Sequence, residues 1–320
     1  MSSAGRVGLL VNPTAGRGAG RAAGERVLSV LRRAGLDVVD VSAHDLEGAR
    51  RAAREQVAGF EALVVVGGDG LVHAGVGAVA GTPTALGIVA AGTGNDIARG
   101  LRLPLGDPVR AAQDVADAVL SGSTRAVDAV RVSTGGAGGS GGSGGATGTT
   151  GWYASILASG VDALVNERAN RWRWPRGPAR YTLAALRELA VVRGVPLRVT
   201  LDGVGFEREA LLVAVANTGC YGGGMLMAPH ADPTDGLLDV VVVDRLSPLA
   251  ALRVFPTVRR GRHLDLPVVS VHRARTVRLE ALPGGAVPRP HADGEPLGEL
   301  PVTCEAVPGA LRVLAPRAAG

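Results

Sequence analysis

The chain has 320 residues, which is enough for two domains of ordinary size. Hydrophobic residues make up 46% and charged residues 20%, a balance that excludes a wholly disordered chain. All 34 basic residues are arginine, so a Walker-A phosphate loop and lysine-based covalent catalysis are excluded. The formal net charge of +5 allows nucleic acid, an anionic membrane surface or phosphorylated ligands as partners.

The cysteines and the N-terminus bear on the cellular compartment. Cys220 and Cys304 are too few for a disulfide framework or a cysteine zinc cluster, and we expect both to be buried thiols. The first residues lead directly into the apolar run Val7–Val11, without the longer apolar stretch of a secretory signal. No stretch approaches about 18 uninterrupted apolar residues, so no membrane span is expected. These features favour a cytoplasmic protein.

Strand-like and helix-like segments alternate up to Thr124. Strands are expected at Val7–Val11, Leu36–Val41, Ala62–Val66 and Ala85–Val89. Helices are expected between them, one marked by Ala23, Val27 and Leu31 and another at Leu46–Val57. This alternation predicts an α/β domain with a parallel sheet that helices cover on both faces. Ligands of such sheets bind at the carboxyl ends of the strands, where three glycine-bearing loops are expected together.

After Thr124, runs of strands predict a second, mostly antiparallel β domain. Strands are expected at Arg125–Val132, Trp152–Ser159, Leu197–Leu201, Glu207–Ala216, Leu237–Val243, Val268–Val271, Thr276–Glu280 and Val302–Ala306, and helices near Asp162–Asn170 and Ala179–Val192. Residues 134–151 hold ten glycines and are expected to form a flexible insertion at a hairpin tip. The predicted domains are residues 1–126 and 127–308, and the strand within 309–316 could return to the first.

Three polar, glycine-rich loops follow the predicted strands. They are Asn12-Pro13-Thr14-Ala15-Gly16, Gly67-Gly68-Asp69-Gly70 and Gly92-Thr93-Gly94-Asn95-Asp96. Glycine lets a ligand approach the backbone closely, and a helix N-terminus favours phosphate. Taken singly, each loop could be an ordinary turn, with Thr14, Asn95 or Asp96 near a helix cap. Taken together on one sheet edge, they favour a phosphate-binding site.

These loops resemble the diacylglycerol kinase catalytic-domain family of lipid kinases, which includes bacterial diacylglycerol kinases and the sphingosine and ceramide kinases. The resemblance continues through Ser159–Ala163, Asn217–Gly219, Gly222–Met225, Ala228–Leu237 and Asp293–Glu295. It covers nearly the whole chain apart from the insertion. The Gly67–Gly70 element alone is shared with NAD kinases and phosphofructokinases, whereas the set with Asp232–Leu237 and Asp293–Glu295 is far more specific.

The resemblance implies ATP-dependent phosphorylation of a lipid hydroxyl, in a cleft between an α/β domain of the phosphofructokinase and NAD kinase type and a β-sandwich domain. Carried over by position, the residues that would hold ATP are Asn12, Pro13, Thr14, Gly16, Gly67, Gly68, Asp69, Gly70, Thr93, Asn95 and Asp96, with Ser42 near the nucleotide. The family pattern makes Asp293 the general base, with Glu295 close by and Asp128 supporting the site. It also places Asp162 near the lipid head group. Apart from the family, Asp293-Gly294 can be a plain turn.

Asp232, Asp235 and the carbonyl of Leu237 form a compact set of oxygen donors, which hard cations such as Mg²⁺ prefer. By resemblance, these positions bind a Mg²⁺ outside the transfer site. The alternative is an Asx-turn that ends at Asp235-Gly236. A phosphate site without lysine must rely on backbone amides, helix dipoles, Mg²⁺ and arginine.

Arginines and aromatic residues interleave between Arg168 and Tyr181, which suits contact with an anionic membrane surface. The alternative is a solvated basic helix whose tryptophans pack on the domain. The same segment could bind RNA, but no signature of a nucleic-acid-binding fold accompanies it. We therefore predict a lipid alcohol as substrate, peripheral contact at the inner membrane face and no nucleic-acid partner, and a homo-oligomer stays open.

Two positions depart from the family pattern. Leu71 stands where Thr or Ser is common, so a hydroxyl that could bond phosphate or metal is missing, and His73 stands where Asn is common. The rival predictions are a soluble-substrate kinase such as an NAD kinase, and a non-catalytic nucleotide- or lipid-binding module. ATP turnover on NAD would identify the first rival, and ATP binding without turnover would identify the second.

Overall fold

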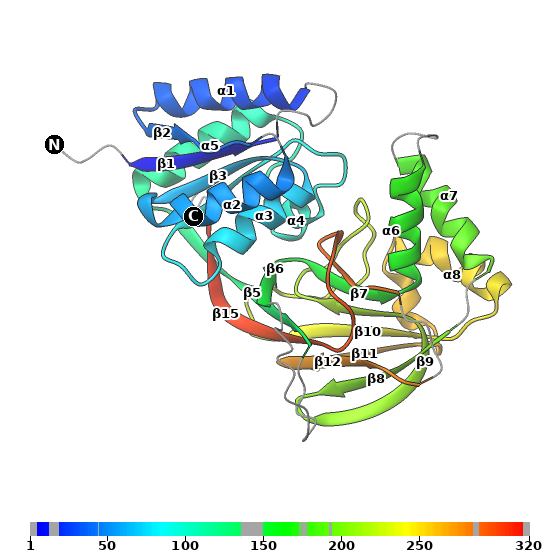
Figure 1. The fold of residues 1–320 in the computed structure, drawn as a ribbon. Coiled ribbons are helices and arrows are strands. Elements are labelled where there is room, and N and C mark those ends of the chain that lie inside the picture. The colour runs from blue at the N-terminus through cyan, green and yellow to red at the C-terminus, as the bar shows by residue number, and fades with distance from the viewer. Residues whose placement is uncertain are drawn as a thin grey trace. The chain divides into compact units, whose positions relative to one another are not determined.

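The computed structural model describes residues 5–12, 19–43, 45–135, 150–172, 174, 178–191, 194–283 and 288–315 (Figure 1). The chain divides into two compact units, one of residues 1–129 with 308–320 and one of residues 130–307. It passes from the first unit to the second within β5 (Thr124–Thr134) and returns within β15 (Val302–Leu314).

Five parallel strands form the sheet of the first unit. In sheet order they are β2 (Asp37–Asp40), β1 (Arg6–Val11), β3 (Ala62–Gly67), β4 (Ala85–Ala90) and the end of β15. Every residue of β3 and β4 is buried, as expected of strands that helices cover on both sides. The parallel α/β sheet predicted from the apolar runs is confirmed.

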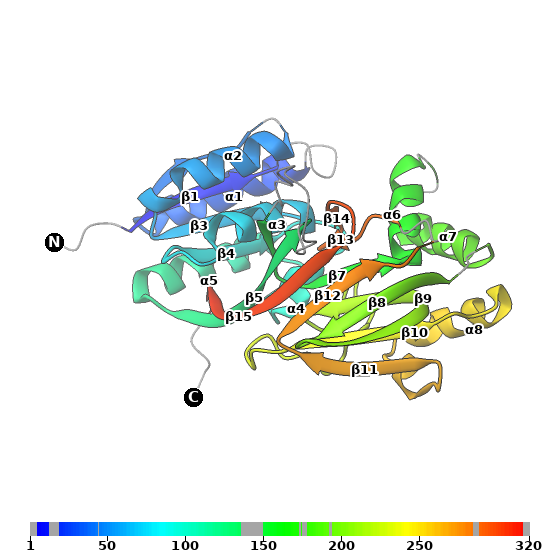
Figure 2. The ribbon, with the colours of Figure 1, turned by 60° about the horizontal axis from the view of Figure 1, so that its bottom comes forward.

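Helices cover both faces of this sheet (Figures 1 and 2). They are α1 (Ala19–Arg33), α2 (Leu46–Gln56), α3 (Asp69–Val79), the short α4 (Asp96–Gly100) and α5 (Pro108–Ser121). Successive strand residues point to opposite faces, so Val64 and Val66 share a core with α1 and α5, whereas Val65 lies against Gly75 of α3. Since the strands are parallel, every loop that follows a strand opens on the same edge of the sheet.

The second unit is mostly antiparallel β structure, as predicted (Figure 2). Its main sheet runs in the order β14 (Glu295–Pro296), β13 (His291–Ala292), β7 (Ile156–Gly160), β9 (Val204–Ala216), β8 (Val195–Leu201), β12 (Thr276–Ala281) and the start of β15. β10 (Leu238–Asp244) pairs with β9 and with β11 (Val269–Ala274), and β6 (Thr150–Tyr153) pairs with β5. The β5–β6 hairpin brackets the predicted insertion, of which residues 136–149 lie outside the described residues.

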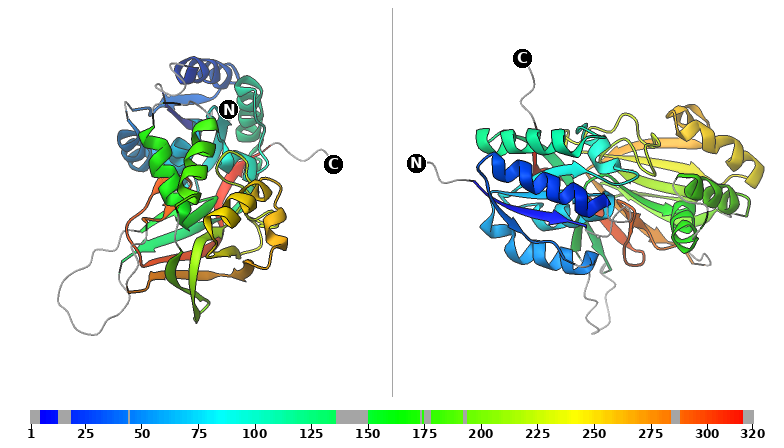
Figure 3. Two further views of the ribbon diagram at one scale, coloured as in Figure 1. Left: turned by 90° about the vertical axis from the view of Figure 1, so that its right-hand side faces the viewer. Right: turned by 90° about the horizontal axis from the view of Figure 1, so that it is seen from above.

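Two apolar clusters stabilise the second unit. One contains buried residues of β5 to β9, β10, β12 and β15, including the large side chains Tyr153, Leu157 and Leu197. The other covers the opposite side of β7, β9 and β10 with residues of α6 (Val161–Arg171), α7 (Pro178–Leu189) and α8 (Pro248–Val258) (Figure 3). In the part of the chain that the structure describes, no helix is both long and apolar enough to cross a bilayer.

Candidate functional site

Two of the predicted glycine loops meet at the carboxyl edge of the first unit's sheet. β3 leads through Gly68 into α3, and β4 leads through Gly92 into α4. The loops touch through their backbones, because a Cβ placed on Gly92 would lie 2.4 Å from the Cα of Gly68. This close approach requires glycine at position 92.

Polar side chains fix the two loops to each other. Asp69 Oδ1 accepts a hydrogen bond from the amide of Ile97 at 3.1 Å, which joins the first loop to α4. Asn95 has a φ of 55° and binds both the amide and the carbonyl of Gly92 at 2.9 Å. The side chain of Asn95 therefore shapes its own loop, and the amide in the first turn of α4 is capped by Asp69 instead.

Further predicted residues lie at or near this edge. Asn12 follows β1, and its amide donates to the carbonyl of Val66 at 3.4 Å. Ser42 Oγ accepts a hydrogen bond from the amide of Val11 at 2.9 Å, so this hydroxyl ties the end of β2 to β1. Thr93 is exposed. Pro13, Thr14 and Gly16 lie outside the described residues.

The edge is suited to phosphate. The first-turn amides of α3, which is eleven residues long, lie at the positive end of its dipole. Leu71, the departure from the family pattern, is 4% exposed and packs against Gly67. Its apolar side chain belongs to the core, so the hydroxyl common at this position has no equivalent here. The groups at this edge that could contact a phosphate are backbone groups and Thr93.

In the second unit, Asp293 lies in the two-residue turn between β13 and β14. The φ values of Asp293 and Gly294 are 52° and 84°, which is the geometry of a type I′ hairpin turn. The carboxylate accepts two backbone hydrogen bonds, from Ala154 N to Oδ2 at 3.0 Å and from Ser155 N to Oδ1 at 2.8 Å. Asp293 therefore forms the plain turn of the alternative prediction, and its carboxylate is also fixed by two backbone amides.

The peptide segment that holds Asp293 is itself held from its other side. Asn217 is 1% exposed and its Nδ2 donates to the carbonyl of Ala154 at 2.8 Å. The amide of Asn217 donates to the carbonyl of Ser155 at 2.8 Å, and Ser155 Oγ hydrogen-bonds Thr218 Oγ1 at 2.8 Å. Asp293 and the Asn217–Gly219 motif therefore join one network through residues 154 and 155, which we call the Asp293 frame.

The frame corrects one predicted element and adds a residue. The sequence predicted a single strand at Trp152–Ser159, but the structure divides this run into β6 and β7 at a bend at Ala154 and Ser155. The sequence could not show this bend, because its apolar pattern runs on without a break. The bend depends on hydrogen bonds from distant residues. Ser155 was not predicted as a site residue, and no local sequence signal marks it.

Tyr153, next to the frame, is fully buried and its hydroxyl donates to the carbonyl of Val215 at 3.2 Å. Burial raises the pKa of Tyr153 well above 10, and its neighbours Cys304 and Asp293 raise it further. Burial also raises the pKa of Cys304 to about 12. Both groups are thus neutral at physiological pH, and the prediction that the two cysteines are buried thiols is confirmed.

Asp162 contacts the loop that follows Asn217. It lies in the first turn of α6, where burial raises its pKa to about 6 and a hydrogen bond from Tyr221 opposes the shift. Tyr221 follows Cys220, whose carbonyl accepts a hydrogen bond from Ser155 Oγ at 3.0 Å. One loop therefore contacts both Asp162 and the Asp293 frame. Glu295 is half-buried in β14, directly across the turn from Ala292.

The predicted cation ligands Asp232, Asp235 and Leu237 lie in one tight loop before β10. Asp232 Oδ1 accepts hydrogen bonds from the amide and hydroxyl of Thr234 at 3.0 and 2.6 Å, and Asp235 Oδ1 accepts from the amide of Leu237 at 2.9 Å. These are the Asx-turn contacts of the alternative prediction. The donors are two carboxylates and a carbonyl, a chemistry that fits Mg²⁺. Among the described residues, no three His, Cys, Asp or Glu side chains gather as a metal site.

Comparison with known proteins gives matches over both units. Residues 6–132 match the diacylglycerol kinase catalytic domain, and residues 155–315 match the YegS C-terminal NAD kinase beta sandwich-like domain. A diacylglycerol kinase of Mycobacterium tuberculosis (strain H37Rv) is 41% identical over 98% of this chain and 96% of its own length. One from Bacillus subtilis (strain 168) is 26% identical over 92% of this chain and 91% of its own length.

The chain belongs to the diacylglycerol kinase family. Its fold agrees, since the crystal structure of a diacylglycerol kinase from Bacillus anthracis, 22% identical, matches it with a TM-score of 0.74 over 99% of both chains. The resemblance seen in the glycine loops and the Asp293–Glu295 motif is confirmed, and so is the two-part α/β and β-sandwich fold. Family membership makes the protein a kinase, and at the level of the family a lipid kinase.

In this kinase, Asp128 is buried in the first unit, with 2% of its surface exposed. Asp128 Oδ1 accepts a hydrogen bond from the amide of Gly309 at 2.8 Å, which ties β5 to the turn within β15. Gly309 has a φ of 63°. The carboxylate therefore holds the returning strand.

The basic and aromatic segment of the kinase lies in α6, α7 and their connection. Trp174 is 81% exposed, and Leu183 and Leu186 of α7 are also exposed. Arg168 forms an ion pair with Glu188, and Arg180 donates to the carbonyl of Trp172 at 3.2 Å. The alternative prediction was a solvated helix whose tryptophans pack on the domain. The exposure of Trp174 contradicts it for this residue. Arg173 and Arg176 lie outside the described residues.

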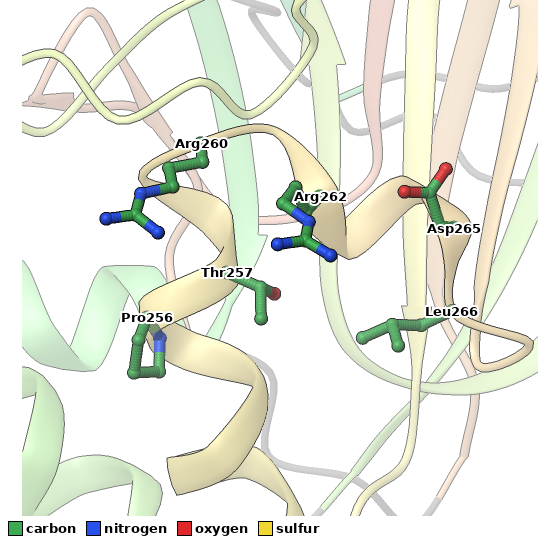
Figure 4. A pocket seen from close by; sticks show the side chains of 6 residues that line it. All are labelled: Pro256, Thr257, Arg260, Arg262, Asp265 and Leu266. Carbon is green, nitrogen blue, oxygen red and sulfur yellow. The ribbon is translucent and has the colours of Figure 1, made fainter.

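A surface pocket of about 380 Å³ lies between α8 and the short helical turn η3 (Arg262–Asp265) (Figure 4). Its lining residues are Pro256, Thr257, Arg260, Arg262, Asp265 and Leu266. Figure 4 shows Arg262 and Leu266 reaching toward Thr257, whereas the carboxylate of Asp265 points away from them. None of the predicted site residues lines this pocket, so it is separate from the Asp293 frame. Its two arginines and one aspartate give its lining a net charge of +1.

Proposed function

We propose that the protein is an ATP-dependent lipid kinase that transfers the γ-phosphate to a lipid hydroxyl of the diacylglycerol type. The observation that carries this proposal is the Asp293 frame, in which two backbone amides hold one carboxylate at 3.0 and 2.8 Å. The frame lies in a protein of the diacylglycerol kinase family. Phosphoryl transfer requires positioned groups more than covalent chemistry, and the frame provides such positioning.

In the proposed step, Asp293 acts as the general base. A carboxylate oxygen accepts the proton of the lipid hydroxyl while the hydroxyl oxygen bonds to the γ-phosphorus. The bond from that phosphorus to the β–γ bridging oxygen breaks, and ADP leaves. A carboxylate oxygen can accept more than one hydrogen bond, so the amide hydrogen bonds do not by themselves prevent contact with the substrate. A base positioned in this way contributes about 10²–10⁴-fold to the rate.

The phosphates of ATP would contact the carboxyl edge of the first unit's sheet at Gly68 and Gly92, which we call the glycine edge. The N-terminus of α3 and the exposed Thr93 lie at this edge. Asp232, Asp235 and the Leu237 carbonyl would hold Mg²⁺. When bound there, Mg²⁺ would neutralise two carboxylates and fix the loop that leads into β10. Glu295 and Asp162 would lie on the acceptor side of the reaction.

We further propose that the kinase works at the inner face of the membrane without crossing it. Support comes from exposed Trp174, from exposed Leu183 and Leu186 on α7, and from the arginines of α6 to α8. An interfacial tryptophan beside arginines suits anionic lipid, where each basic residue contributes about 1 kcal/mol. A lipid alcohol substrate would be reached from this surface.

The test is transfer of labelled γ-phosphate from ATP, with Mg²⁺, to lipid alcohols in anionic mixed micelles, with NAD as a soluble control substrate. Wild-type protein is expected to label an organic-extractable product. Asp293→Asn is expected to lose about 10²–10⁴-fold of transfer and to keep ATP binding. The asparagine amide would face a backbone N–H, so we also expect a loss of about 1–3 kcal/mol in the free energy of unfolding.

Asp202 provides a matched control. It occupies another Asp-Gly turn, between β8 and β9, with a φ of 47°, and its carboxylate accepts the amides of Arg275 and Thr276. Asp202→Asn is expected to lose similar stability with unchanged transfer. Equal transfer by both variants and wild type would remove Asp293 from the mechanism. Label in NADP would instead identify a soluble-substrate kinase, and ATP binding without any label would favour a non-catalytic module.

A further inference from the structure

The loop proposed to hold Mg²⁺ faces an arginine on the neighbouring strand. Asp239 of β10 and Arg273 of β11 are directly paired in the antiparallel ladder. Arg273 Nε lies 3.7 Å from Asp239 Oδ1, and the same guanidinium forms an ion pair with Asp235. One positive group therefore joins the loop residue Asp235 to a carboxylate inside the sheet.

The charges around this guanidinium do not balance. Asp239 is 5% exposed, so its carboxylate is almost fully removed from solvent. Two carboxylates share one guanidinium, and Asp232 adds a third negative charge three residues from Asp235. A buried carboxylate requires a nearby positive charge, so the loop is built to accept more positive charge than Arg273 supplies.

The carboxylate of Asp235 is already engaged on both oxygens. Oδ1 accepts the amide of Leu237 at 2.9 Å, and Oδ2 contacts Arg273. A cation that binds Asp235 must therefore share this carboxylate with the guanidinium or displace it. Asp239, opposite Arg273 in the ladder, remains as a partner for a displaced guanidinium.

We propose that Arg273 is the built-in counter-ion of the cation loop: it holds Asp235 and Asp239 when no cation is bound, and it competes with the divalent cation for Asp235. This proposal rests on the cation role of Asp232, Asp235 and Leu237 in the proposed function. Arg273 is thereby a positioning residue that sets the cation affinity of the loop.

The test measures binding of the metal alone, without nucleotide or lipid. Mg²⁺ and Mn²⁺ are titrated by calorimetry into full-length wild type, Arg273→Met, Arg273→Lys and Arg275→Met. Arg275 is exposed, and its side chain has no ion pair or hydrogen bond among the described residues, so Arg275→Met controls for net charge. Arg273→Met is expected to bind the cation about tenfold more tightly. A neighbouring arginine changes the affinity of a carboxylate for a proton by at least about that factor. Arg273→Lys and Arg275→Met are expected to stay within about twofold of wild type.

A second measurement uses wild-type protein, in case Arg273→Met does not fold. The Nε–Hε NMR signal of Arg273, assigned by its loss in Arg273→Lys, is expected to shift on saturation with Mg²⁺. An unmoved signal, or Arg273→Met affinity within about twofold of wild type, would overturn the counter-ion role while the cation loop stands. If Asp235→Asn binds Mg²⁺ as wild type does, the cation loop of the proposed function fails first, and the role of Arg273 falls with it.

Discussion

Two Asp-Gly turns in the second unit are nearly identical in local structure and differ in what surrounds them. At Asp202 and at Asp293, φ is positive, the aspartate amide donates to a strand carbonyl at 3.0 Å, and the carboxylate accepts two consecutive backbone amides. Asp202 is exposed, and the peptides that it binds continue as an ordinary strand, β12. Asp293 is half-buried, and the peptides that it binds are held again by Asn217 and Thr218.

The difference teaches that the turn alone does not make a candidate base. Asp-Gly favours positive φ, and a carboxylate in such a turn readily accepts nearby amides, so the local motif forms wherever a hairpin needs it. At Asp293, buried hydrogen bonds from Asn217 and Thr218 hold the carbonyls of the two residues whose amides the carboxylate binds. At Asp202, the corresponding residues are held by backbone hydrogen bonds of ordinary strand pairing. Positioning of this kind is what a catalytic carboxylate needs and what a structural turn can lack.

Among the residues that surround the two turns, Asn217 is expected to give the largest effect. Asn217→Ala removes the Nδ2 hydrogen bond to the carbonyl of Ala154 and leaves the bend at Ala154 and Ser155 less constrained. We expect a loss of about 2 kcal/mol in the free energy of unfolding. We also expect kcat to fall by about a hundredfold with an unchanged KM for ATP, because Asp293 is no longer held in place. Urea unfolding and steady-state kinetics measure the two effects.

Thr84→Val is the matched control for stability. Thr84 is 3% exposed, and its hydroxyl donates to the carbonyls of Val57 and Phe60 at 3.1 Å in the first unit. Its loss is expected to cost about 1–2 kcal/mol without changing kcat. If Asn217→Ala and Thr84→Val lower kcat equally, the effect is one of stability, and the distinction between the two Asp-Gly turns loses its functional meaning.

Two glycines of the first unit also differ mainly in what surrounds them. An alanine Cβ at position 92 would lie 2.4 Å from Gly68 Cα and 2.9 Å from Asn95 Oδ1, whereas one at Gly59 would meet nothing within 4 Å. Gly92→Ala is expected to lose about 2 kcal/mol of stability and to raise the KM for ATP about tenfold, because the two loops must move apart. Gly59→Ala is expected to stay within about 0.5 kcal/mol of wild type. A wild-type unfolding midpoint for Gly92→Ala would contradict the contact between the loops.

Sequence patterns predicted the glycine edge well because its parts are local. Apolar runs mark β1, β3 and β4, and parallel pairing then brings the ends of these strands to one edge. What the pattern could not predict is which side chain binds which loop. Asp69 reaches the amide of Ile97, 28 residues away, through the register of two neighbouring strands, so this contact depends on tertiary structure.

The Asp293 frame was predicted only in part. The motifs at Asn217 and Asp293 were recognised, but the bend that joins them was interpreted as continuous strand, because its residues are apolar or small. Its contacts link residues 138 and 139 positions apart along the chain. The two-residue strands β13 and β14 are likewise too short to give a periodic pattern.

The smallest effect concerns Asp162, an acidic group whose surroundings change its titration. Its pKa is about 6 in the folded protein and 3.8 in an unperturbed side chain, so the folded state binds the extra proton. The stability that this proton contributes is complete below about pH 4 and is lost as the pH rises to 6. Asp162→Asn does not titrate, so its stability relative to wild type is expected to rise over that interval. Allowing for partial exposure, we expect a gain of about 1–2 kcal/mol at pH 8.

Tyr221→Phe tests the cause of the pKa shift of Asp162 by removing its hydrogen-bond donor. The Tyr221 hydroxyl donates to Asp162 and lowers its pKa, so removing the hydroxyl raises the pKa and moves the loss of stability to higher pH. Urea unfolding of wild type, Asp162→Asn and Tyr221→Phe at half-unit steps from pH 4 to 8 distinguishes these curves. Parallel curves for all three proteins would mean that Asp162 is solvated like an ordinary surface aspartate. In that case its surroundings would resemble those of Asp202, and the loop after Asn217 would no longer connect Asp162 to the Asp293 frame.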